Sequence, residues 1–136
     1  YDTLIKQYQN HEKLHFDTNT PTPILIQHAS AVATINSTVG IESLLLNKKL
    51  ITLGQAFYQL PGLCLIATDQ TSLAESLKLI KGWEINQDLR TGFFNYLACD
   101  YQVSGRWQEA TSEHLEACAH KLSFLLKESV SDKVVY

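Results

Sequence analysis

The sequence predicts an α/β fold, a Rossmann-like parallel sheet with flanking helices, followed by a helical tail. Short apolar runs alternate with helical patterns up to about residue 82. These runs are apolar throughout, as expected of strands that are covered on both faces. No strand pattern follows them. We therefore interpret residues 1–136 as a single α/β domain, with a strand–helix core over 1–82 and a helical tail over 83–136.

A helix, a strand and a second, short helix are expected before the core strands. Residues 1–10 carry apolar side chains at helical spacing, which predicts a helix. Residues 14–17 (LHFD) alternate apolar and polar side chains, which predicts a strand. Residues 19–23 (NTPTP) predict a turn into a short helix over 24–30, because proline is favoured in the first turn of a helix.

The pattern of the core predicts three strands joined by helical crossovers. Each expected helix places its apolar side chains on one face and is bounded by hydroxyl-bearing, amide or glycine residues. Thr71 and Ser72 are expected to cap the second of these helices. We expect strands at 31–35, 50–54 and 63–67, helices at 39–47 and 71–82, and a loop over 55–62.

The tail reads as two helices, over 86–101 and 107–128. Trp83 and Trp107 flank the first of them. We expect both to anchor it; the alternative is that the pair is exposed and marks an interface with another domain.

Histidine and cysteine recur in the second tail helix. His114 and Cys118 lie one helical turn apart, and His120 follows. No fourth ligand stands at a suitable spacing, so we favour a solvated helix face over a metal site.

Composition excludes several classes of protein. The net charge of −3 provides no basic surface for duplex nucleic acid. The apolar runs are far shorter than the roughly 20 residues of a membrane-spanning helix. The chain contains no Met and opens on a helical pattern, so we interpret it as part of a longer protein.

The three cysteines, Cys64, Cys99 and Cys118, form no zinc-ligand pattern. Each lies in an apolar strand or helix pattern, which favours buried free thiols in a reducing cytoplasm.

The stretch ATINSTVGIE, residues 33–42, carries the main functional signal. Parallel sheets bind ligands beyond the carboxyl ends of their strands, where helix N-termini favour anions. Asn36, Ser37, Thr38 and Gly40 follow a strand directly, so they offer hydroxyls and backbone N–H groups to a phosphate, and Gly40 lets a ligand approach the backbone. The alternative is an ordinary capped helix start.

Four further residues are candidates at or near this edge. Glu42, in the first turn of the following helix, can accept hydrogen bonds from ribose hydroxyls or complement the helix dipole. Gln55 and Tyr58, in the loop after the second strand, can contact a sugar or pack under the loop. His28 can face the site or serve as a partly buried structural residue.

The block TINSTVGIESLLLNKKLITLGQAFYQLPGL resembles the motif of the bacterial capsule polysaccharide biosynthesis family. The family pattern runs roughly T-I-N-S-T-V-G, an E-A-L helix, K-P-V-I-x-L-G and A-F-Y-x-x-P-G-L. The later run LRTGFFNYLACDYQVSGRW is similar to the family's tail. The resemblance covers most of residues 22–107.

The resemblance implies a cytoplasmic glycosyltransferase, peripheral to the inner membrane, that transfers 3-deoxy-D-manno-octulosonic acid (Kdo) in the lipid-linked capsule pathway. It implies the two-domain GT-B architecture, of which this chain is the C-terminal, donor-binding half. Ser37 and Thr38 would then hold the phosphate of CMP-Kdo, and Glu42 would face the ribose or cytosine. No metal or other cofactor is expected. Expected partners are a glycolipid acceptor, the N-terminal domain and the capsule export machinery.

The sequence departs from the family pattern in two ways. No His-Pro dipeptide occurs, and Lys48-Lys49 replaces the usual Lys-Pro. The catalytic base is expected in the N-terminal half, so we expect this part to be inactive by itself. The alternatives are a non-catalytic α/β module of the capsule export assembly and a transferase or epimerase for another nucleotide sugar.

Overall fold

The computed structural model describes residues 2–105 and 107–131. They form two compact units, Tyr1–Arg90 and Thr91–Tyr136. The boundary between the two units falls after Arg90. Each unit is described by itself below.

The first unit contains a three-stranded parallel sheet, as the sequence predicts. Its strands are β1 (Ala31–Thr34), β2 (Lys49–Thr52) and β3 (Leu65–Ile66), in the order β1-β2-β3. The registers pair Ala31 with Lys49 and Ile51 with Leu65. The parallel pairing of all three strands confirms the α/β prediction.

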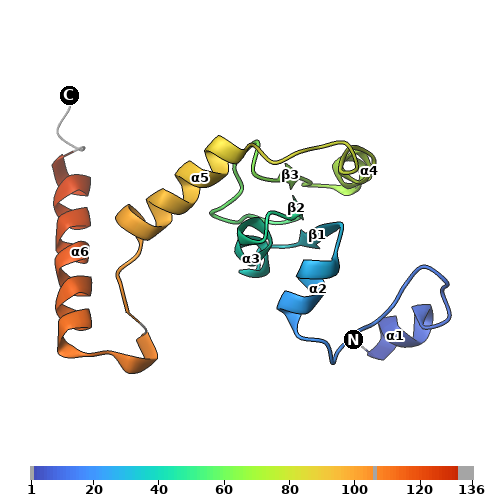
Figure 1. The fold of residues 1–136 in the computed structure, drawn as a ribbon, viewed down its shortest axis with the longest axis horizontal. Coiled ribbons are helices and arrows are strands. Elements are labelled where there is room, and N and C mark those ends of the chain that lie inside the picture. The colour runs from blue at the N-terminus through green and yellow to red at the C-terminus, as the bar shows by residue number, and fades with distance from the viewer. Residues whose placement is uncertain (1, 106, 132–136) are drawn as a thin grey trace. The chain divides into compact units, whose positions relative to one another are not determined.

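Helices flank this sheet, and Figure 1 shows them around it. The helix α3 (Val39–Leu45) packs against β1 and β2, α2 (Thr22–His28) packs against α3, and α4 (Gln70–Leu79) packs against β3. The short helix α1 (Asp2–Tyr8) buries no residue. The core between these elements is fully buried and consists mainly of Leu44, Leu50, Ile51, Tyr58 and Leu63.

The strand expected over 14–17 is absent, and this prediction is wrong. Residues 14–17 have no regular structure, and Leu14 and Phe16 are exposed. The Asp17 carboxylate accepts hydrogen bonds from the Asn19 and Thr20 amides, at 2.9 and 2.8 Å, and so forms a turn at once. Alternation alone does not make a strand when no neighbouring strand pairs with it.

The helix α4 begins earlier than the sequence suggests, because Asp69 caps it. The Asp69 carboxylate accepts the Ser72 amide at 2.7 Å, and the Ser72 hydroxyl accepts the Asp69 amide at 3.0 Å. Ser72 is therefore the third residue of the helix within a capping box. The expectation that Thr71 and Ser72 cap the helix is wrong by two residues.

The second unit is helical, as expected. The helix α5 (Gln87–Tyr96), which begins in the first unit, continues as the π-helical turn η1 (Leu97–Tyr101). A 3₁₀ turn η2 (Trp107–Glu109) precedes α6 (Ser112–Ser131). Trp83 is half-buried, whereas the Trp107 side chain lies outside the described part of the chain. In the ranges that the structure describes, no helix combines the length and apolar character needed to cross a membrane.

Candidate functional site

The loop over residues 35–38 leaves the carboxyl end of β1, where the sequence analysis places the ligand site. Backbone hydrogen bonds continue the β1–β2 pairing into this loop: Leu53 N–H donates to Thr34 O and Gly54 N–H to Ile35 O, both at 2.9 Å. The loop is thus fixed to the end of β2. Asn36, Ser37 and Thr38 are exposed there.

Tyr58 is buried against this loop and fixes it through a hydrogen bond. Its side chain is 1% exposed, and its hydroxyl donates to the Ser37 carbonyl at 2.6 Å. Burial away from water raises the pKa of the Tyr58 phenol. A ring buried in this way supports the loop and is not available to a sugar, so of the two roles considered for Tyr58 the structure favours packing.

Gly40 serves the same packing. A Cβ atom at this position would lie 2.4 Å from the Tyr58 ring carbon Cζ. We expected the missing side chain to admit a ligand to the backbone. Instead, the Tyr58 ring occupies that space.

Ser37 satisfies the first amides of α3 with its own oxygens. The Val39 N–H donates to the Ser37 hydroxyl at 3.3 Å, and the Gly40 N–H donates to the Ser37 carbonyl at 3.0 Å. Thr38 occupies the cap position without a side-chain cap hydrogen bond. Within the described residues, the amides of Ser37 and Thr38 and the O–H groups of both side chains donate to no partner, so these groups are the donors left for an anion.

Glu42 lies at the same end of α3, in its first turn. Its side chain is half-buried and makes no hydrogen bond to the described part of the chain. Asn36, Ser37, Thr38 and Glu42 are therefore grouped at one end of α3.

His28 lies elsewhere. It is exposed at the last position of α2, just before β1 begins. Nearby, the Lys48 ammonium donates to the Gln27 carbonyl at 2.7 Å ahead of β2. This is the amino edge of the sheet, so the structure places His28 at the opposite end of β1 from Ser37.

Gln55 and Gln59 line a shallow pocket at the carboxyl ends of β2 and β3. The pocket measures about 210 Å³ and is lined by Leu53, Gly54, Gln55, Gln59, Ala67 and Thr68. Gln55 is exposed. Gln59 was not among the residues that the sequence singled out, because one amide in a loop has no characteristic spacing.

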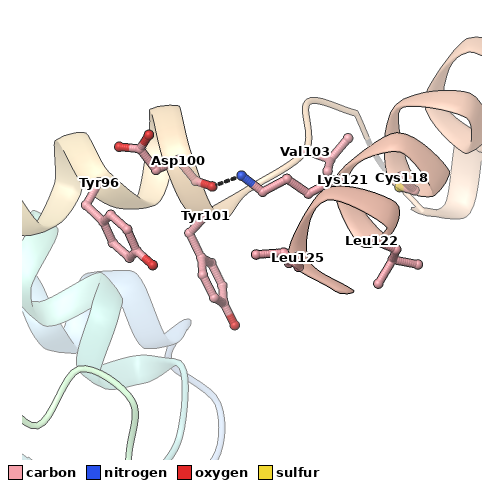
Figure 2. Close-up of a pocket in the computed structure, with 8 residues that line it drawn as sticks. All are labelled: Tyr96, Asp100, Tyr101, Val103, Cys118, Lys121, Leu122 and Leu125. Carbon is pink, nitrogen blue, oxygen red and sulfur yellow. Dashed lines mark hydrogen bonds between the residues drawn. The ribbon is translucent and has the colours of Figure 1, made fainter. Parts of the chain in front are cut away.

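A further pocket lies in the second unit. It measures about 500 Å³ and is lined by Tyr96, Asp100, Tyr101, Val103, Cys118, Lys121, Leu122 and Leu125. Figure 2 shows Lys121 reaching from α6 toward the carbonyl oxygen of Asp100, to which its ammonium donates a hydrogen bond. Apolar side chains make up most of the remaining wall.

The histidine and cysteine pair of α6 forms a local contact. The Cys118 sulfur lies 3.7 Å from His114 Nε2, and His114 Nδ1 lies 2.8 Å from the Ser104 carbonyl. Across the residues that the structure describes, no three His, Cys, Asp or Glu side chains are grouped in a way that could hold a metal ion.

Comparisons with known proteins identify relatives of this chain. The family model described as "Capsule polysaccharide biosynthesis protein" matches residues 1–107. Protein FixF of Sinorhizobium fredii is 41% identical over 99 residues, which cover 73% of this chain and 24% of FixF. No solved structure matches the chain.

Two further relatives carry capsule functions in their names. The capsule polysaccharide export protein KpsS of Escherichia coli is 45% identical over 60 residues, 44% of this chain and 15% of KpsS. The capsule polysaccharide modification protein LipB of Neisseria meningitidis is 40% identical over 57 residues, 42% of this chain and 13% of LipB. The chain spans about a quarter or less of the length of these relatives. By the match over residues 1–107, the chain belongs to the capsule polysaccharide biosynthesis protein family.

Proposed function

We propose that this chain is the donor-binding half of a capsule glycosyltransferase of the GT-B type, which transfers Kdo from CMP-Kdo to a lipid or Kdo-lipid acceptor. One observation carries the proposal: the exposed loop over 35–38 follows β1 at the carboxyl edge of a parallel sheet, in a chain of the capsule family. Ligands of open α/β sheets bind at this edge.

The available groups suit a nucleotide. The amides of Ser37 and Thr38 and the hydroxyls of both residues are donors for the phosphate that leaves when the sugar is transferred. Donors already fixed in place stabilise such a developing charge without reorganisation. The half-buried Glu42 carboxylate would accept hydrogen bonds from the ribose or from the cytosine amine.

The remaining parts of the proposal concern the whole protein. We place the catalytic base in an N-terminal domain and expect transfer without a metal ion, because the helix end and side-chain donors would stabilise the phosphate. A glycolipid acceptor and the capsule export machinery are the proposed partners, at the cytoplasmic face of the inner membrane.

Titration with CMP tests donor binding. We expect CMP to shift the backbone amide resonances of residues 36–40 and 42, with the amides of Ser37 and Thr38 shifting most because they lack an internal partner. No shift at millimolar CMP, or shifts confined to other segments, would contradict the proposal.

One observation favours a second candidate, a non-catalytic module of the export assembly. Ser37 already occupies the Val39 and Gly40 amides, as in a helix start that needs no ligand. Ser37→Ala in the complete protein separates the two functions. As a cap alone, Ser37 contributes about 0.5–2 kcal/mol of stability and nothing to transfer. As a phosphate ligand, its loss lowers kcat/KM roughly 100-fold or more.

Two controls accompany this variant. Ser30→Ala removes an exposed hydroxyl at the amino edge of the sheet and should change neither stability nor kcat/KM. Glu42→Gln keeps the size of the side chain and removes its charge, so it should weaken donor binding with little change in Tm. The matched variant Glu75→Gln, on the exposed face of α4, should leave donor binding unchanged.

A further inference from the structure

The pocket at the ends of β2 and β3 adjoins the loop over 35–38 through one residue. The Gly54 N–H donates to the Ile35 carbonyl at 2.9 Å, and the Gly54 carbonyl accepts a hydrogen bond from the Gln59 side-chain Nε2 at 2.6 Å. The volume of about 210 Å³ is smaller than that of pockets for drug-sized ligands, which suits a single ring or a short polar chain. A ligand held at the loop could therefore place one part of itself in this pocket.

The Gln59 side chain is fixed in one orientation. Its Nε2 group donates to the Thr52 hydroxyl at 2.8 Å and to the Gly54 carbonyl at 2.6 Å. A carbonyl can only accept, so the group facing Gly54 must be the NH₂ and not the oxygen. Both donors are used. The oxygen Oε1 has no partner in the described residues and is not buried, so it is an oriented acceptor of a residue that lines the pocket.

Thr52 reinforces this orientation. It is completely buried, and its hydroxyl lies 3.4 Å from the Leu65 carbonyl and 3.6 Å from the Cys64 sulfur. With its hydrogen directed to one of these groups, the hydroxyl oxygen is available to accept from Gln59. The buried Thr52 thus helps to fix the Gln59 side chain, so little conformational entropy is lost when a ligand binds to its oxygen.

The charges around the pocket favour a neutral occupant over an anionic one. Neither this pocket nor the adjoining cavity of about 270 Å³, which shares Leu53, Ala67 and Thr68 with it, is lined by a Lys or Arg. Asp69 is one of the residues that line the adjoining cavity. Hydrogen bonds from Ser72 lower the pKa of Asp69, so it is charged at neutral pH. A carboxylate or phosphate placed here would have no countercharge.

We propose that this pocket binds the neutral, hydroxyl-bearing part of the donor sugar, with Gln59 Oε1 accepting a hydrogen bond from a sugar hydroxyl and Thr68 offering a second polar contact. The inference rests on the proposed function. It assigns two parts of the CMP-Kdo donor to two neighbouring sites. The phosphate lies at the loop over 35–38, and the uncharged polyol chain of the sugar lies at the ends of β2 and β3.

Amide shifts with CMP and with CMP-Kdo test this division. CMP alone should shift residues 36–40 and leave the pocket unchanged. CMP-Kdo should in addition shift the Gln59 side-chain NH₂ and the amides of Gln55 and Thr68. Pocket shifts with CMP alone would assign the pocket to the base and overturn the inference. Shifts at 36–40 without any pocket response to CMP-Kdo would overturn it too, but would leave the proposed function standing. Absence of shifts at 36–40 would overturn the proposed function itself.

Variants give a second measurement. Gln59→Met should weaken CMP-Kdo binding about tenfold and leave CMP binding unchanged, because one hydrogen bond to the sugar is lost. Gln27→Met, an exposed glutamine at the amino edge, is the matched control and should change neither affinity. If Gln59→Met does not fold, Thr68→Val keeps the side-chain shape at an exposed position and should weaken CMP-Kdo binding severalfold. Equal weakening of CMP and CMP-Kdo, or no weakening of either, would contradict the inference.

Discussion

Gly40 and Tyr58 together fix the loop that carries the candidate site. The Tyr58 ring fills the place where a Gly40 side chain would stand, and its hydroxyl holds the Ser37 carbonyl. The backbone of Gly40 is ordinary helix, so the glycine is required by close packing and not by an unusual φ angle. Two residues that look functional in the motif thus act by positioning Ser37.

Gly40→Ala should destabilise the first unit. The added Cβ would meet the Tyr58 ring at 2.4 Å, and overpacking of this kind costs about 1–3 kcal/mol. Urea unfolding measures the change. Gly92→Ala is the control, because nothing lies within 4 Å of its added Cβ in α5. Replacing a helical glycine there should be neutral or stabilising by up to about 1 kcal/mol. Equal losses in both variants would contradict the packing argument.

Tyr58→Phe should cost about 0.5–1.5 kcal/mol, because the Ser37 carbonyl loses its hydroxyl donor while the ring stays in place. If the loop binds CMP, the variant should also weaken CMP binding, since the amides of residues 37 and 38 lose their fixed position. Tyr96→Phe, at an exposed position, should change neither quantity. Unchanged stability in Tyr58→Phe would show that water replaces the hydroxyl without cost.

For single residues, the sequence predicts which side chains lie at the same edge of the sheet. It does not predict which of them are left without hydrogen bonds inside the protein. Ser37 and Glu42 follow from the strand-to-helix pattern, because any residue after a parallel strand reaches the carboxyl edge. The burial of Tyr58 and the orientation of Gln59 depend on contacts with Ser37, Thr52 and Gly54. Such contacts join residues whose pairing leaves no periodic trace in one sequence.

The end of α3 is held by a residue that lies far along the chain. Arg90 donates from Nε to the Leu44 carbonyl at 2.6 Å and from an NH₂ group to the Leu45 carbonyl at 2.8 Å. These carbonyls belong to the last turn of the helix, where a positive charge is favourable, and the Leu44 carbonyl also accepts the Asn47 N–H at 3.1 Å. Arg90 therefore joins the start of α5 to the helix that carries the candidate site.

Arg90→Met should lower the free energy of unfolding by about 1.5–3 kcal/mol, as expected when hydrogen bonds from a charged group are lost. Arg90→Lys should recover less than half of this loss, because an ammonium lacks the planar fork that reaches two carbonyls at once. Chemical denaturation compares the variants. Lys78→Met, on the exposed side of α4, serves as the charge-matched control and should have a small effect. Full recovery with lysine would mean that charge alone is needed.

The cap of α4 should make part of the stability dependent on pH. Hydrogen bonds from the Ser72 amide and hydroxyl lower the pKa of Asp69 below its ordinary value of 3.8. A carboxyl whose pKa is lower in the folded state stabilises the fold above its unfolded pKa, and this contribution is lost as the pH falls through the folded pKa. Asp69→Ala should therefore lower Tm at pH 7 and have a smaller effect well below pH 3.8. A constant loss at all pH values would exclude the carboxylate as the cause.

The sequence predicts a strand correctly where an apolar run also has a neighbouring strand with which it can pair. The three apolar runs form the parallel strands, although β3 keeps only Leu65–Ile66 of the expected 63–67. The run at 14–17 has the alternation of a strand without a partner, and it stays irregular. The start of α4 was misplaced because Ser72 and Asp69 both fit a cap, and only their mutual hydrogen bonds show which one is the cap.

Across the whole molecule, the three cysteines lie in three different environments. Cys64, beside β3, is 3% exposed, whereas Cys118 is half-buried and Cys99 is exposed in η1. The sequence predicts free thiols that are all buried, and for Cys99 this is wrong. An apolar helical pattern shows that a residue lies in a helix, but the face that is covered depends on what packs there.

Because the three thiols differ in exposure, their labelling rates report separately on the two units. Burial raises the pKa of the Cys64 thiol, so little of the reactive thiolate forms, and the surrounding core excludes reagents. With a chromogenic disulfide reagent at pH 8, Cys99 should react at once and Cys118 more slowly. Cys64 should react roughly a thousandfold or more slowly than Cys99, because the reagent reaches it only when the sheet opens.

Unfolding in urea gives the second measurement. Cys64 labelling should rise together with the loss of secondary structure measured by circular dichroism. A Cys64→Ala variant identifies the slow phase, since that phase should vanish. Rapid labelling of Cys64 in native buffer would mean that the edge of the sheet at β3, which carries the Gln59 pocket, is open in solution.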